Sequence, residues 1–240
     1  MSDELIRSHE GHVTRLTLNR PHKANALSAG LVETLLDAVE YACTDGTRLL
    51  ILDGAGAHFC AGFDFTDYQN ASEGDLALRF LRIEALLQAL YHAPCETLVL
   101  AQGKIFGAGA DLVASCSTRV AAPETTFRMP GLRFGVVLGT RRLVQRIGAD
   151  RARDALSASR TFGAEEALRM GFLTATAVPS AWPQLIEQTR ARCELLSPGA
   201  AAALHRQTVV DTRADDMAAL AHSVSKPGLK ERIRLYREHN

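Results

Sequence analysis

Two short apolar segments, each ended by glycine and separated by a helix-length segment, most constrain the fold of this chain. The segments are RLLILDG (48–54) and ETLVLAQG (96–103), and both have the length of a buried strand. Between them, DLALRFLRIEALLQALYHA (75–93) has the length and composition of a helix. This alternation predicts an α/β layered core with parallel strands, and it argues against a helical bundle or a β-sandwich.

The neighbouring segments extend this prediction. HVTRLTLNR (12–20) alternates apolar and polar residues with a period of two, as a half-buried strand does. Ser28 is placed to cap a helix over 29–43. After residue 140 the character changes to helices. Three helices and a last strand candidate are predicted at 140–148, 149–159, 163–171 and 172–179, in that order.

Only helices are predicted from Trp182 onward. The segments 197–208 and 225–240 are joined to the rest by polar turns, and neither can bury its apolar face alone. We therefore expect them to pack on the core or on a neighbouring subunit.

Composition excludes several classes of protein. The 240 residues suffice for one main domain, and Lys plus Arg equals Asp plus Glu at 27 each, so no net charge attracts nucleic acid or an anionic membrane. No stretch has the ~20 apolar residues of a membrane span, and the N-terminus lacks the pattern of a signal peptide. We expect a soluble, cytoplasmic protein. Its five scattered cysteines show no zinc or dithiol spacing, so they are expected to be reduced and mostly buried.

Two turns rich in small residues follow the two apolar strands. They are GAGAHFCAGFDFTDY (54–68) and GKIFGAGADLVASC (103–116), and neither contains a P-loop or a complete dinucleotide fingerprint. Small residues let a ligand approach the backbone, and a turn that enters a helix leaves N–H groups without intrahelical partners. Two such groups aimed at one carbonyl oxygen form an oxyanion hole. For either turn alone, tight turning and close helix packing are sufficient explanations.

Four segments in register resemble the crotonase superfamily, the enoyl-CoA hydratase and isomerase group. They are NRPHKANALS (19–28), GAGAHFCAGFDF (54–65), the segment 103–130 and GAEEALRMGFLT (163–174), which together cover nearly the whole chain. The resemblance implies a spiral of ββα units at 1–190 and a C-terminal helical segment at 191–240 that builds a trimer. It also implies an acyl-CoA thioester substrate whose enolate is held by two backbone N–H groups.

The resemblance assigns roles to individual residues. The N–H donors fall on Phe63 and Ala108, and the catalytic acid falls on Asp111. No metal and no cofactor is implied beyond the CoA of the thioester, and a thioester on an acyl-carrier protein is an alternative substrate. The residues that match the CoA-binding segments are Lys23, Ala24, Ala26, Phe63, Asp64, Phe65 and Thr66.

The chain departs from the hydratase pattern at one position. Hydratases use two carboxylates, and the matching positions here are Asp111 and Gly131. The dienoyl-CoA isomerase branch has an aspartate at the first position and two further acids, which correspond to Gly131 and Gly139. Water addition needs one group to orient water and another to transfer the proton, so we expect isomerisation or decarboxylation rather than hydration. Asp111 also has a structural explanation, since an acid in a first helical turn is stabilised by the helix dipole.

Some alternatives stay open at this stage. Arg128 and Arg133 flank Gly131 and can either meet a substrate carboxylate or be ordinary surface arginines. Glu84 is expected to be solvated, although its helix can line the pocket in such folds. The alternative to an enzyme is a catalytically silent homologue that binds acyl-CoA or serves as an oligomer subunit. The assembly is expected to be a homotrimer or a hexamer made of two trimers.

Overall fold

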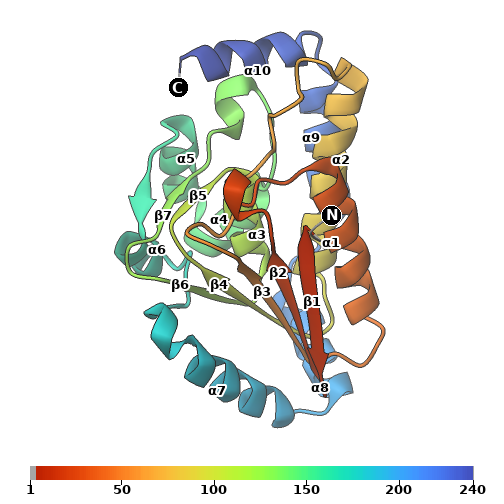
Figure 1. Cartoon of the computed structure of the whole chain (residues 1–240), viewed down its shortest axis with the longest axis vertical. Helices are drawn as coiled ribbons and strands as arrows, with labels where there is room; N and C mark the ends of the chain where they lie inside the picture. The colour runs from red at the N-terminus through yellow and green to blue at the C-terminus, as the bar shows by residue number, and fades with distance from the viewer. Residues whose placement is uncertain (1–3, 240) are drawn as a thin grey trace.

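A six-stranded sheet forms the centre of the computed structural model, which describes residues 4–239 (Figure 1). Its spatial order is β1-β2-β3-β4-β6-β9, with β1 and β2 antiparallel and every later neighbouring pair parallel. The strands are β1 Leu5–Glu10, β2 Val13–Leu18, β3 Leu49–Gly54, β4 Glu96–Ala101, β6 Thr118–Ala121 and β9 Ala175–Thr176. The predicted α/β core with parallel strands is confirmed.

The edge strand β1 was not predicted, because Leu5 is its single buried residue and the strand has no apolar alternation. The predicted last strand at 172–179 is reduced to β9, and Phe172 and Leu173 before it are buried in the core instead.

A second, smaller sheet follows directly from the first. Its order is β5-β7-β8, and β5 begins three residues after β4 ends. The parallel pairing of β5 with β7 places Phe106 beside Arg128. The three strands of this sheet have two or three residues each, which is too short for a periodic pattern, so none of the three was predicted. Their bounds are β5 Lys104–Phe106, β7 Thr126–Arg128 and β8 Phe162–Gly163.

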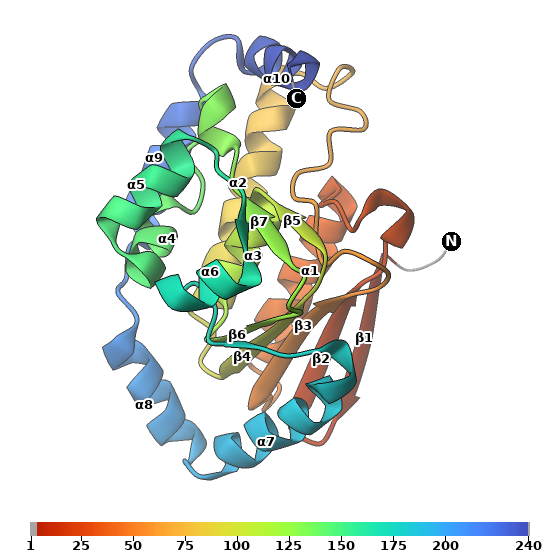
Figure 2. The same cartoon turned by 90° about the vertical axis from the view of Figure 1, so that its left-hand side faces the viewer.

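Helices cover both faces of the main sheet, since side chains of β3 alternate between two apolar clusters. Leu50 and Leu52 pack with α1 and α2, whereas Leu49 and Ile51 pack with α7 (Figure 2). The α-helices are α1 Ala29–Ala42, α2 Glu73–Tyr91, α3 Ala108–Ser115, α4 Thr140–Ile147, α5 Ala149–Ser157, α6 Ala164–Met170, α7 Trp182–Glu194, α8 Pro198–Thr208, α9 Arg213–Val224 and α10 Leu229–Glu238. The 3-10 helices are η1 Pro21–Lys23, η2 Gly131–Phe134 and η3 Pro179–Ala181.

Helix starts follow the capping signals. The Ser28 hydroxyl accepts the Leu31 N–H at 3.0 Å, as predicted for the start of α1. Ser72 and Asp75 form a capping box at the start of α2, which therefore begins two residues earlier than predicted.

The C-terminal helices divide into two groups. α9 and α10 pack on α2, and α10 also contacts η2, so these helices lie on the chain's own core. α8 has no buried residue and lies at the opposite end of the molecule from α10 (Figure 2). The predicted boundary between 190 and 191 falls within α7, and the oligomerisation role of 191–240 remains a prediction.

No helix within residues 4–239 is long and apolar enough to cross a membrane. The five cysteines form no disulfide, and Cys60, Cys95 and Cys116 are buried, as predicted.

Candidate active site

The two turns rich in small residues pack directly against each other. Gly62 has a φ of 84°, and a Cβ built on it would lie 2.4 Å from the Phe106 carbonyl oxygen and 3.3 Å from the Ala108 nitrogen. A Cβ built on Gly109 would lie 2.3 Å from the Cys60 carbonyl oxygen. Glycine is therefore required on both sides of this contact, since a side chain at either position would separate the turns.

Backbone hydrogen bonds fix this contact and use most of its N–H groups. Leu27 N–H donates to the Gly62 carbonyl at 2.7 Å, and Asp64 N–H donates to the Leu27 carbonyl at 3.2 Å. Gly107 N–H donates to the Arg128 carbonyl at 2.8 Å. Within residues 4–239, neither the Phe63 nor the Ala108 N–H donates to a backbone oxygen. Both N–H groups predicted for an oxyanion hole are therefore without a backbone acceptor among the described residues.

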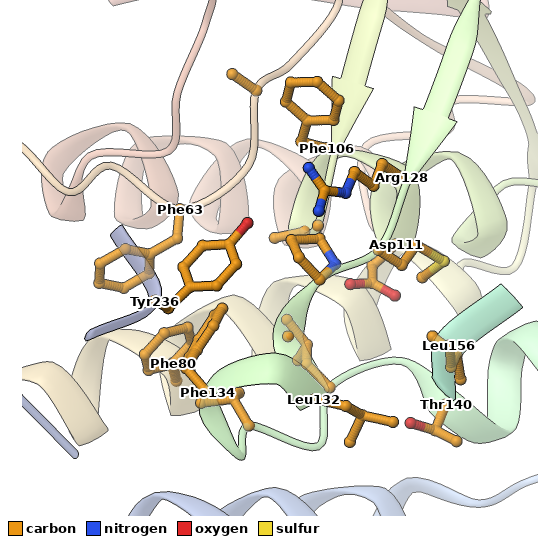
Figure 3. Close-up of a pocket in the computed structure, with 18 of the residues that line it drawn as sticks. Phe63, Phe80, Phe106, Asp111, Arg128, Leu132, Phe134, Thr140, Leu156 and Tyr236 are labelled. Atoms are coloured by element: carbon orange, nitrogen blue, oxygen red, sulfur yellow. The ribbon is translucent and has the colours of Figure 1, made fainter. Parts of the chain in front are cut away.

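A cavity of about 290 Å³ lies beside these turns, and both Phe63 and Ala108 line it (Figure 3). Its wall is mostly apolar, and the Phe63 ring stacks on Phe80 with centroids 4.3 Å apart. Tyr236 of α10, from the far end of the sequence, completes the wall. The aromatic lining residues are Phe63, Phe65, Phe80, Phe106, Phe134 and Tyr236.

Among residues 4–239, Asp111 is the single carboxylate that lines this cavity. It lies in the first turn of α3, whose eight residues are all buried, and its side chain contacts the cavity. Its Oδ1 is buried with no hydrogen-bond partner within the part of the chain that the structure describes. Burial raises the pKa of Asp111 to about 8, while the Arg142 charge lowers it and the Glu84 charge raises it further.

The two glycines at the expected acid positions differ in their surroundings. Gly131 begins η2 and lines the cavity. Gly139 lies directly against Asp111, because a Cβ built on it would be 1.7 Å from Asp111 Oδ1. The Asp111 carboxylate cannot keep its present position if residue 139 has a side chain. The absence of an acid at 139 is therefore coupled to the placement of Asp111.

The predicted CoA-binding residues are brought together in part. The Ala61 N–H donates to the Ala24 carbonyl at 2.9 Å, so the loop at 23–26 lies beside the first turn. Phe63 and Phe65 line the cavity. The other five predicted residues do not line it, and their role in CoA binding stays a prediction. They are Lys23, Ala24, Ala26, Asp64 and Thr66.

The Asp64 carboxylate is hydrogen-bonded to other residues of the protein. Its carboxylate accepts a hydrogen bond from Arg20 at 2.8 Å and from the Thr66 N–H at 2.9 Å. Burial raises its pKa, but the bonds from Thr66 and Arg20 outweigh burial and lower it. Arg20 also donates to the Ala26 carbonyl at 2.5 Å, so the Asp64–Arg20 pair ties the loop at 23–26 to the first turn.

Sequence reasoning was wrong about the environment of Glu84. Its side chain is buried rather than solvated, and it does not line the cavity. Arg142 donates to the two Glu84 oxygens at 2.9 and 2.5 Å, and to Asp216 at 3.4 Å. This ion cluster joins α2, α4 and α9 behind Asp111. The segment TRRLV gave no signal for it, since a buried arginine at a helix start resembles an exposed one in sequence.

Comparison with known proteins identifies the family. The family model for enoyl-CoA hydratase/isomerase matches residues 8–225. The chain therefore belongs to the enoyl-CoA hydratase/isomerase family, which is the crotonase superfamily that its motifs resemble. The fold is accordingly the crotonase-like ββα spiral.

Individual relatives show how far the similarity extends. A solved structure from Bordetella parapertussis, provisionally named an enoyl-CoA hydratase/isomerase, is 49% identical, covers 98% of both chains and has a TM-score of 0.96. A provisionally named enoyl-CoA hydratase of Mycobacterium tuberculosis is 33% identical over 66% of this chain and 65% of that protein. Ethylmalonyl-CoA decarboxylase of Mus musculus is 31% identical over 79% of this chain and 60% of that enzyme. The matched region thus spans less than two thirds of these two curated relatives.

Proposed function

We propose that this chain is an enzyme that acts on acyl-CoA thioesters through an enolate. The Phe63 and Ala108 N–H groups hold the thioester oxygen as it gains negative charge, and Asp111 transfers the proton. Support comes from the two N–H groups without backbone acceptors and from their position on one cavity with Asp111. Each oxyanion donor is worth about 2.7–4 kcal/mol of transition-state stabilisation in enzymes where it has been measured.

One observation favours isomerisation or decarboxylation over hydration: Asp111 is the single carboxylate that lines the cavity. In isomerisation, the Asp111 carboxylate takes a proton from one carbon of the acyl group and returns it to another. In decarboxylation, the bond between Cα and the departing carboxylate breaks, CO₂ leaves, and its electron pair enters the enolate. The protonated Asp111 then gives its proton to Cα and is reprotonated by water. Neither sequence needs a second acid, whereas water addition does.

The test is a mass-spectrometric screen in D₂O with crotonyl-, 3-enoyl-, 2,4-dienoyl- and malonyl-type CoA thioesters. We expect a shifted double bond or loss of CO₂, with deuterium incorporated into the product. Asp111→Asn should abolish isomerisation, whereas the exposed Asp67→Asn serves as the matched control. Binding of acyl-CoA without turnover of any member would favour the silent homologue. Turnover that is unchanged in Asp111→Asn would remove Asp111 from the mechanism.

The pH dependence separates the two reactions. An isomerase needs the Asp111 carboxylate, so its kcat/KM should rise with pH until the pKa of about 8 is passed. A decarboxylase needs the protonated acid, so its rate should fall above that pH. We further propose a cytoplasmic location, with a thioester on an acyl-carrier protein as an alternative substrate.

We also propose a homotrimer, or a hexamer of two trimers. The observation that supports assembly is the exposed apolar surface around α8. Leu195, Leu204 and Val210 are exposed there, and no residue of α8 is buried. Light scattering coupled to size-exclusion chromatography measures the mass directly. A monomer at micromolar concentration would contradict this part of the proposal.

A further inference from the structure

Arg128 carries the sole positive charge among the residues that line the cavity. Apart from Arg128 and Asp111, the lining contains two polar side chains, Thr140 and Tyr236, and the rest is apolar or glycine. A cation facing an apolar cavity attracts an anion more strongly than a cation in water does, because the surroundings screen it less.

Contacts on both sides hold Arg128 in this position. Its backbone is paired with Phe106, and its carbonyl accepts the Gly107 N–H at 2.8 Å, one residue before Ala108. Its Nε donates to the Ser159 carbonyl at 3.1 Å and to the Ser159 hydroxyl at 3.2 Å. Ser159 is buried and has a φ of 49°, which is unfavourable for a residue with a side chain.

These contacts fix the stem of the side chain beside the second turn. Figure 3 shows the Arg128 guanidinium next to Phe106, on the same side of the cavity as Asp111. A cation is thus held beside the turn that supplies the Ala108 N–H.

Among the described residues that line the cavity, Asp111 is the acid that can carry a negative charge near neutral pH. Burial raises the pKa of Asp111 to about 8, and the charges that modify this value are those of Arg142 and Glu84. At neutral pH Asp111 is therefore mostly protonated and uncharged. The Arg128 side chain thus lines the cavity together with an acid that carries little negative charge.

We propose that Arg128 binds a carboxylate carried by the acyl group itself, so that the substrates are CoA thioesters of dicarboxylic acids. This inference rests on the proposed function, which places the thioester oxygen at the Phe63 and Ala108 N–H groups. The guanidinium fork matches a carboxylate in a bidentate geometry. The phosphates of CoA lie at the far end of the pantetheine arm from the thioester, so they are separated from a cation beside Ala108.

The role has a kinetic signature. A carboxylate that is held by Arg128 and takes no part in the reaction is bound equally in the ground state and in the transition state, which lowers KM without raising kcat. Arg128 is thus a specificity-determining residue, and its replacement should appear in Kd and KM.

The experiment is calorimetric titration of the full-length protein with free CoA and with matched acyl-CoA pairs. Malonyl and propionyl, succinyl and butyryl, and adipyl and hexanoyl thioesters have equal carbon counts and differ by a carboxylate in place of a methyl group. The wild type should bind the carboxylated member of at least one pair about 10- to 100-fold more tightly. Arg128→Gln should reduce this ratio to within about twofold of one and leave the Kd for free CoA unchanged.

Two further variants keep the test decisive. Arg133→Gln is the matched control, since Arg133 is exposed and does not line the cavity, and it should keep the wild-type ratio. Arg128→Lys keeps the charge but loses the planar fork, so the ratio should fall at least about threefold even if Arg128→Gln fails to fold. Thermal unfolding of each variant reports whether it is folded.

Three outcomes overturn the proposal. The first is a wild-type protein that binds both members of every pair equally. The second is an Arg128→Gln variant in which the Kd for free CoA rises by the same factor, because Arg128 then contacts the CoA portion. The third is an Arg128→Lys variant with an unchanged ratio.

Failure of the proposed function gives a different result from failure of this inference. Asp111-dependent deuterium exchange without carboxylate preference rejects the role of Arg128 and keeps the enolate chemistry. Carboxylate preference without exchange on any thioester keeps the recognition and rejects the chemistry.

Discussion

Two carboxylates on neighbouring helices, Glu84 of α2 and Asp111 of α3, are both almost fully buried and have opposite surroundings. Glu84 is 1% exposed, and its oxygens accept hydrogen bonds from Arg142 and from Gln88. Asp111 is 3% exposed, and its Oδ1 has no partner within residues 4–239. Burial alone therefore does not tell whether a carboxylate has hydrogen-bond partners. What differs is that the first carboxylate has a buried cation beside it and the second faces a cavity.

Arg142 is the group that separates the two environments. Burial lowers its pKa, but the hydrogen bonds that Arg142 donates to Glu84 and the charges of Glu84, Asp111 and Asp216 outweigh burial and raise it. Arg142 thus stays charged in the core and neutralises the cluster. The Arg142 charge also lowers the pKa of Asp111, and so it offsets part of the increase that burial causes.

The largest effect is expected when this cation is removed. Arg142→Met leaves Glu84 and Asp216 as buried charges without their shared partner, which should lower the free energy of unfolding by about 3–5 kcal/mol. Urea unfolding followed by circular dichroism measures this value. The double variant Arg142→Met with Glu84→Gln should recover part of the loss. If Arg142→Met were as stable as the wild type, the ion cluster would not contribute to the free energy of unfolding.

The pH dependence of stability is the next largest effect. The folded-state pKa of Asp111 is raised to about 8 from its ordinary value of 3.8, so between these values the folded protein holds a proton that the unfolded chain has lost. Unfolding then releases a proton, and this group makes stability fall as pH rises through that window.

Asp111→Asn lacks this titration. Relative to the wild type, the variant should gain up to about 4 kcal/mol of stability between pH 5 and pH 8. Denaturant unfolding of both proteins at the two pH values gives the difference. An equal difference at both values would show that Asp111 has an ordinary pKa.

The same substitution should reduce activity. If Asp111 is the proton-transfer group, Asp111→Asn lowers the turnover of an isomerase at least about 100-fold. Steady-state kinetics on the substrate found in the screen measures this loss, and the Kd for free CoA should stay within about twofold. Glu84→Gln with Arg142→Met tests the other carboxylate, and its kcat should change less if the cluster is structural.

A smaller effect is expected at the contact between Gly139 and Asp111. Gly139→Ala introduces a Cβ 1.7 Å from Oδ1 at a φ of 66°, so the Asp111 carboxylate must move. Gly228→Ala is the matched control, since Gly228 has the same left-handed conformation, with a φ of 81° and a ψ of 24°, and a Cβ there meets no atom within 4 Å. Both should lose about 1–2 kcal/mol of stability through the left-handed backbone. Only Gly139→Ala should also lose activity, by about tenfold. Equal activities in the two variants would contradict the coupling of position 139 to Asp111.

Sequence patterns predicted the parts of this molecule that are set by local chemistry. Apolar segments predicted β3 and β4, and Ser28 predicted the start of α1. The two turns of small residues directed attention to the cavity. The short strand β7 and the ion cluster at Arg142 were missed, because pairing across distant segments leaves no periodic pattern.

The sequence alone therefore determined the α/β class, the family and the presence of one acid, Asp111, in the second turn of small residues. These depend on residue identity and on spacing along the chain. Only the tertiary structure decided which carboxylate is paired, which N–H groups stay available, and that Arg128 and Tyr236 reach one cavity. Such properties depend on burial and on contacts between segments far apart in sequence. Electrostatic environment is a property of position in space, so no pattern along the chain specifies it.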